Sequence, residues 1–122
     1  MIPGMICIVD DDPLVHFAVK KLIRSVAPEK EIISFSDGAE ACAYLRNNAG
    51  NDALLPDAIL LDLHTPYMPG MMFLELYAEM QPALMKDICI YVISSTLDRE
   101  EIAAATAQPH VKTFISKPVR KP

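Results

Sequence analysis

The stretch "ICIVDDDPLV" at residues 6–15 joins an apolar run to three adjacent aspartates and then returns at once to apolar residues. Three like charges within a few ångströms repel one another unless a cation or protons compensate them. A solvated acidic turn is one explanation, and a binding site is the other. The residues that end the other apolar runs of the chain distinguish the two.

Short apolar runs alternate with segments of helical period along the chain. We predict strands over residues 5–9, 31–35, 58–61, 88–93 and 111–115. We predict helices over residues 13–26, 37–48, 70–80 and 98–107. The first, third and fourth strands are almost continuously apolar, as in a parallel sheet buried on both faces, so the other two suit the edges. This alternation predicts an α/β fold with a doubly wound, five-stranded parallel sheet.

Two helix starts carry capping signals. Asp12 followed by Pro13 is typical of an N-cap and first turn, so we assign Asp12 a structural role. Asp98 and Glu101 have the spacing of a capping box. The expected buried stripe of the first helix consists of Val15, Val19, Leu22, Ile23 and Val26.

The length and composition of the chain exclude several classes of function. A chain of 122 residues with 52% hydrophobic content suits one compact globular domain, here taken as residues 1–122. A net charge of −5 argues against direct nucleic-acid binding. No secretory signal and no apolar stretch of roughly 20 residues is present, so no membrane partner is expected. Cys7, Cys42 and Cys89 lie in apolar segments and are expected to be free core thiols in a reducing cytoplasm.

Polar residues end four of the predicted strands. Asp10 and Asp11 follow the first strand, Asp62 the third, Ser94 the fourth and Lys117 the fifth. Because parallel strands bring their carboxyl ends to one edge of a sheet, we expect these side chains to meet there. Grouped carboxylates suit Mg²⁺, and a carboxylate beside such a metal can attack phosphorus. An ammonium and a hydroxyl nearby would hold the phosphoryl oxygens.

These residues resemble the receiver domains of two-component response regulators. The resemblance rests on Asp10–Asp11, Asp62 in "LLDLHTPYMPG", Ser94 in "VISS", and "FISKP" at residues 114–118. The motifs span nearly the whole chain in the family's order and spacing. The resemblance implies a flavodoxin-like sheet of strand order 2-1-3-4-5.

The resemblance also implies the reaction. Asp62 would accept a phosphoryl group from a phosphohistidine of a sensor histidine kinase or a phosphotransfer protein. Mg²⁺ would be held by Asp10, Asp11, Asp62 and the backbone carbonyl of His64. The domain would catalyse only its own phosphorylation and dephosphorylation, and would not otherwise be an enzyme.

Further positions take family roles by the same resemblance. Ser94 would be the switch hydroxyl and Phe114 the switch aromatic, and Lys117–Pro118 would be a cis peptide bond, a type almost confined to proline. His64 and Thr96 would influence how water reaches the acyl phosphate, and hence its lifetime.

The sequence departs from the family in places. Thr65 and Pro69 replace the usual residues of the loop after Asp62, without removing a reacting group. After Pro118 only residues 119–122 remain, so the family's fifth helix is expected to be absent or truncated. An uncovered apolar flank would favour self-association, and a homodimer is therefore among the expected partners.

Two other functions remain open from sequence. "DDDPLV" has the Asp-x-Asp spacing of haloacid-dehalogenase-like phosphohydrolases, in which Asp10 would be the nucleophile, although Asp98 is the only candidate for their late acidic motif. A pseudo-receiver would bind partners without phosphorylation, but its hallmark is the loss of a rim residue, and none is lost here.

Overall fold

The computed structural model describes residues 4–118, in which strands and helices alternate. The strands are β1 (Met5–Val9), β2 (Glu31–Phe35), β3 (Ala58–Asp62), β4 (Cys89–Ser94) and β5 (Val111–Ser116). The helices are α1 (Pro13–Val26), α2 (Gly38–Asn47), α3 (Gly70–Met80) and α4 (Arg99–Thr106). Two short 3₁₀ turns, η1 (Asp52–Leu54) and η2 (Gln81–Ala83), were not predicted.

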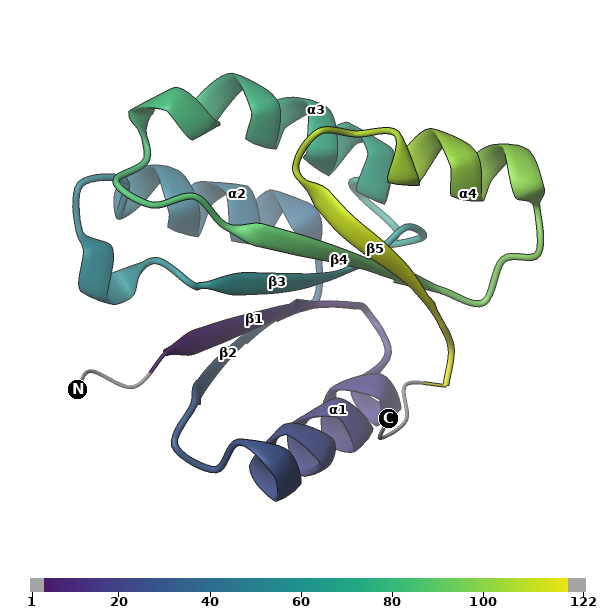
Figure 1. The fold of residues 1–122 in the computed structure, drawn as a ribbon, viewed down its shortest axis with the longest axis horizontal. Helices are drawn as coiled ribbons and strands as arrows, with labels where there is room; N and C mark the ends of the chain where they lie inside the picture. Colours follow the sequence, from purple (N-terminus) through teal and green to yellow (C-terminus); the bar gives the residue numbers. More distant parts are fainter. Residues whose placement is uncertain (1–3, 119–122) are drawn as a thin grey trace.

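The five strands form one parallel sheet in the order β2-β1-β3-β4-β5 (Figure 1). This confirms the flavodoxin-like arrangement and places β2 and β5 at the edges, as predicted. Helices α2, α3 and α4 lie on one side of the sheet, and α1 lies on the other (Figure 1). The prediction about a fifth helix concerns residues 119–122, which lie outside the described residues.

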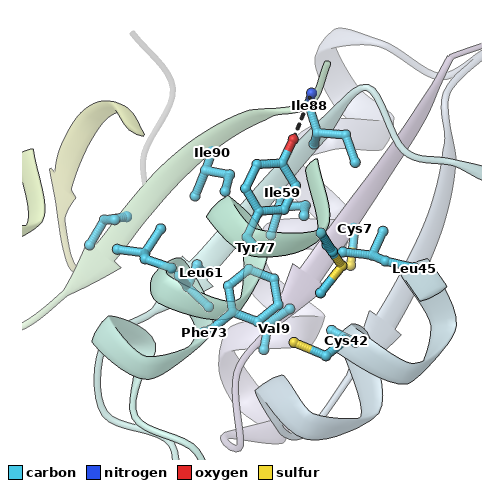
Figure 2. Packing of buried hydrophobic residues seen from close by; sticks show 14 of the residues in the cluster. Cys7, Val9, Cys42, Leu45, Ile59, Leu61, Phe73, Tyr77, Ile88 and Ile90 are labelled. Carbon is cyan, nitrogen blue, oxygen red and sulfur yellow. Dashed lines mark hydrogen bonds between the residues drawn. The ribbon is translucent and has the colours of Figure 1, made fainter. Parts of the chain in front are cut away.

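The main core lies between the sheet and the layer of α2 and α3. Phe73 and Tyr77 of α3 are fully buried against strand residues such as Ile59 and Leu61 (Figure 2). The Tyr77 hydroxyl accepts a hydrogen bond of 3.1 Å from the backbone nitrogen of Ile88, just before β4. A buried amide needs such a partner, so this contact ties α3 to the entry of β4.

Helix α1 packs on the opposite face with a smaller apolar cluster. Val19 and Ile23 are buried against Ile8 of β1, and Val15 packs beside them. Val26 is 59% exposed, so its place in the predicted buried stripe was wrong. It is the last residue of the helix, whose buried residues are Val19 and Ile23.

The helix starts confirm one capping prediction and correct the other. Asp12 Oδ1 accepts a 2.9 Å hydrogen bond from the Leu14 nitrogen, as an N-cap does. Asp98 likewise caps α4 through the Glu100 nitrogen. Glu101 does not close a capping box, because the Asp98 nitrogen already donates to Thr96 Oγ1 at 3.2 Å.

The three cysteines are free but differ in environment. Cys7 and Cys42 are buried, and burial raises the pKa of Cys7 to about 12. Cys89 is exposed, so its prediction as a core thiol was wrong. It is the first residue of β4, where the strand emerges at the amino edge of the sheet. Among residues 4–118, no helix has both the length and the apolar character needed to cross a membrane.

Candidate functional site

The predicted rim residues do meet at the carboxyl edge of the sheet. The backbone pairing runs on past the strands, with the Asp10 nitrogen bonded to Phe35 O at 3.1 Å and the Lys117 nitrogen bonded to Ser94 O at 3.0 Å. This pairing holds the residues that follow the strands in line with one another. One carboxylate oxygen from each of Asp10, Asp11 and Asp62 lies within 4.8 Å of the others.

The three consecutive aspartates at residues 10–12 differ in how deeply they are buried. Asp10 is fully buried, Asp11 is exposed, and Asp12 is exposed at the start of α1. Asp10 Oδ1 accepts a 2.8 Å hydrogen bond from the Asp12 nitrogen, which fixes the turn. Asp10 and Asp11 therefore belong to the site, and Asp12 belongs to the helix.

Lys117 is the cation of the site. Its Nζ lies 2.9 Å from Asp10 Oδ2 and 3.4 Å from Asp62 Oδ2. Burial by itself would lower the pKa of Lys117, but the hydrogen bond to Asp10 and the charges of Asp62 and Asp10 raise it on balance. Lys117 therefore stays protonated and offsets part of the negative charge.

Asp62 is a carboxylate in an environment that disfavours its charge. Burial raises its pKa, and the neighbouring Asp10 charge raises it further. The backbone hydrogen bond from His64 and the Lys117 ammonium act in the opposite direction without cancelling the increase. A cation at the site would relieve this repulsion.

The donor set fits a hard divalent cation. Asp10 Oδ2 is buried and, apart from the Lys117 ammonium, has no hydrogen-bond partner among residues 4–118. Asp11 is open to solvent beside it, so a metal ion bound here would keep water ligands. Carboxylate oxygens with room for water are the set that Mg²⁺ and similar ions accept.

Ser94 and Phe114 lie where the sequence led us to expect them. Ser94 is buried at the end of β4, and its Oγ accepts a 3.1 Å hydrogen bond from the Thr96 nitrogen. Phe114 pairs in register with Val92 and is half-buried against the main core. Thr96 caps the loop before α4 through its hydroxyl. The Lys117–Pro118 peptide bond is cis.

His64 sits between the site and α4. Its backbone nitrogen donates to Asp62 Oδ1 at 3.1 Å. Its imidazole Nε2 lies 2.7 Å from Glu101 Oε1 on the first turn of α4. Sequence reasoning singled out His64 but missed its partner, which was assigned to the capping box.

The sequence analysis named Thr65 only as a departure from the family, and it missed how Thr65 and Gly70 shape the loop after Asp62. Thr65 is buried, and its hydroxyl donates to Met68 O at 2.5 Å. Gly70 lies so close to β3 that a Cβ there would stand 2.7 Å from Leu63 Cα and 2.9 Å from Asp62 O. The "PG" pair at residues 69–70 was the available signal, since glycine permits close backbone approach.

A family model, that of the response regulator receiver domain, matches residues 6–122. The chain belongs to this family. Receiver domains are phosphoacceptor signalling modules, so the family assignment establishes that role for this receiver domain and favours it over the phosphohydrolase alternative.

The receiver domain is similar to named relatives over most of its length. It is 36% identical over 114 residues to protein-glutamate methylesterase/protein-glutamine glutaminase 2 of Cereibacter sphaeroides. That match covers 93% of this chain but only 28% of the relative, so the chain spans under a third of that protein.

Two solved structures illustrate the structural likeness. A two-component response regulator from Cytophaga hutchinsonii has a TM-score of 0.84 and 27% identity, covering 98% of this chain and 90% of that one. The CheX–CheY–BeF3–Mg²⁺ complex of Borrelia burgdorferi has a TM-score of 0.73 and 29% identity, covering 98% and 81%.

Proposed function

We propose that Asp62 is the phosphoacceptor of this receiver domain. A carboxylate oxygen of Asp62 attacks the phosphorus of a donor phosphohistidine, and the N–P bond breaks as the imidazole leaves with its electron pair. The observation that carries the proposal is the position of Asp62 at the end of the central strand β3, 3.4 Å from the Lys117 ammonium.

We propose that Mg²⁺ is the cofactor, held by Asp10, Asp11, Asp62 and the backbone carbonyl of His64. When bound, it neutralises charge on the phosphoryl oxygens. The fit of the three carboxylates supports this assignment. The Borrelia burgdorferi relative forms a complex that contains both BeF3 and Mg²⁺.

Lys117 and Ser94 serve as the phosphoryl-binding residues in this proposal. Lys117 already faces the Asp62 carboxylate and supplies a fixed positive charge. The Ser94 hydroxyl now accepts from the Thr96 nitrogen, and its own proton is free to be donated to a phosphoryl oxygen. Phe114 then follows the movement of the β4–α4 loop as the switch aromatic.

The partners follow from this chemistry. The donor is a sensor histidine kinase or a phosphotransfer protein, and the domain catalyses only its own phosphorylation and dephosphorylation. We propose that residues 1–122 form one receiver domain in the cytoplasm. The intact rim favours this function over that of a pseudo-receiver, because Asp10, Asp62, Ser94 and Lys117 are all in place.

The test is phosphorylation by a small donor. Incubation with acetyl phosphate and Mg²⁺ should add one phosphoryl group to the wild-type chain, measured by intact mass or by a Phos-tag gel. Asp62→Asn should abolish the addition, and chelation of Mg²⁺ should prevent it. Asp11→Asn should raise the Mg²⁺ concentration required.

The matched control is Asp12→Asn, because asparagine also caps a helix and this residue lies outside the site. It should take up the phosphoryl group as the wild type does. Stoichiometric phosphorylation that persists in Asp62→Asn would refute the assignment.

A further inference from the structure

The contact between His64 and Glu101 links two segments that flank the candidate phosphoacceptor. His64 belongs to the loop after β3, and Glu101 belongs to the first turn of α4. The Glu101 side chain is 29% exposed and the His64 side chain 58% exposed. At 2.7 Å, with an acceptor-only carboxylate, the imidazole Nε2 is the donor.

Nothing in the local structure of α4 requires Glu101 to turn towards His64. The helix is capped by Asp98 through the Glu100 nitrogen, and the Asp98 nitrogen is satisfied by Thr96. The carboxylate of Glu101 is therefore not needed for capping. Among its hydrogen bonds to described residues, the one to His64 is the tertiary contact.

The backbone of His64 is anchored at the site. The backbone nitrogen of His64 lies 3.1 Å from Asp62 Oδ1, so the side chain of His64 begins next to the Asp62 carboxylate. The imidazole itself is turned towards Glu101 of α4. The contact with Glu101 directs Nε2 towards α4, so this nitrogen cannot accept a hydrogen bond from a water molecule at the phosphoryl group.

We propose that Glu101 is a positioning residue that holds the His64 imidazole away from Asp62 and so prolongs the life of the phosphorylated state. The inference rests on the proposed phosphorylation of Asp62. Hydrolysis begins when a water oxygen attacks phosphorus. The bond between phosphorus and the Asp62 oxygen then breaks, the carboxylate leaves with the electron pair, and the water protons remain with the released phosphate or solvent. A freed imidazole can hydrogen-bond that water and orient it.

The test is a double-mutant cycle on the phosphoryl lifetime. Wild type, Glu101→Ala, His64→Ala and the double variant are phosphorylated with acetyl phosphate, desalted into Mg²⁺ buffer and followed by Phos-tag gel. Glu101→Ala should shorten the half-life several-fold. This is less than the roughly 100-fold or more of a fully positioned general base, because the imidazole spends only part of its time over the site.

The shortening of the phosphoryl half-life by Glu101→Ala should disappear when His64 is replaced by alanine. The double variant should therefore have the half-life of His64→Ala alone. Glu101→Gln should keep a lifetime near that of the wild type, since its amide oxygen still accepts from Nε2. The matched control is Glu100→Ala, which removes the neighbouring, exposed glutamate of the same helix turn and should leave the lifetime unchanged.

Three outcomes would overturn the inference. The first is an unchanged or longer half-life in Glu101→Ala, and the second is an equal shortening with and without His64. The third, a wild-type chain that takes up no phosphoryl group, would overturn the proposed function as well. Normal uptake with unaltered lifetimes would refute the role of Glu101 alone.

Discussion

Asp62 is a buried carboxylate whose folded environment opposes its ionisation. Burial and the Asp10 charge raise its pKa above the ordinary value of 3.8. Such a group binds its proton more tightly in the folded state. Its contribution to stability is present below the unfolded-state pKa and is lost as the pH rises through the folded-state pKa. At neutral pH without metal, the ionised Asp62 therefore destabilises the fold.

We expect Asp62→Asn to raise the free energy of unfolding at neutral pH in the presence of EDTA. The gain should shrink as the pH falls through the raised folded-state pKa of Asp62, and it should be lost below the ordinary value of 3.8, because the wild-type carboxyl is then neutral too. Urea unfolding at several pH values measures the difference. Asp12→Asn serves as the control and should change stability little at any of them. A gain that is independent of pH would contradict the electrostatic explanation.

At the scale of elements, the link between α3 and β4 depends on one buried hydroxyl. Tyr77 is fully buried, and its oxygen is the partner of the Ile88 nitrogen (Figure 2). Removing the hydroxyl leaves the amide of Ile88, a residue that is only 4% exposed, without its hydrogen-bond partner.

We expect Tyr77→Phe to lower the free energy of unfolding by about 1–3 kcal/mol, measured by urea denaturation. The control is Tyr44→Phe, because the Tyr44 hydroxyl makes an exposed hydrogen bond to Leu54 O, which water can replace. Its cost should be at most about 1 kcal/mol. Equal costs for the two variants would mean that burial of the Ile88 amide does not matter.

Local sequence signals predicted the helices and strands well where neighbouring residues determine where an element begins and ends. Asp12 and Pro13 start α1 at the predicted residue, and the apolar runs mark the strands to within one residue at either end. The capping box at Asp98 failed because Thr96, outside the motif, supplied the acceptor first. The exposure of Cys89 likewise depends on where β4 emerges from the sheet.

At the scale of the whole molecule, the two faces of the sheet are covered unequally. Among residues 4–118, α1 alone covers one face (Figure 1). Leu14 and Phe17 of α1 are 75% and 64% exposed. A groove of about 320 Å³ lies between α1 and Lys117–Pro118, lined by Leu14 and Ala18 among others. Exposed apolar surface of this kind favours association.

We expect the protein to form a homodimer through the α1 face as its concentration rises, detected by sedimentation velocity. Leu14→Glu should weaken the dimer, and an acidic residue suits the first turn of a helix, so α1 should remain folded. Leu97→Glu is the control, since Leu97 is 90% exposed and belongs to the β4–α4 loop instead of α1. A chain that stays monomeric, or equal weakening by both variants, would count against this surface.

The sequence by itself determined the alternation of strands and helices, and with it the meeting of Asp10, Asp11, Asp62, Ser94 and Lys117 at one edge. Parallel strands with helical crossovers bring all their carboxyl ends to the same side, so residues far apart in sequence converge without any knowledge of distances. Only the tertiary structure decided how deeply Asp10 and Asp62 are buried, and that the Lys117 ammonium forms ion pairs with both carboxylates. Only it decided that Glu101 contacts His64, because that contact depends on where α4 packs across the loop after β3. Such a contact leaves no periodic or spacing signal in the chain.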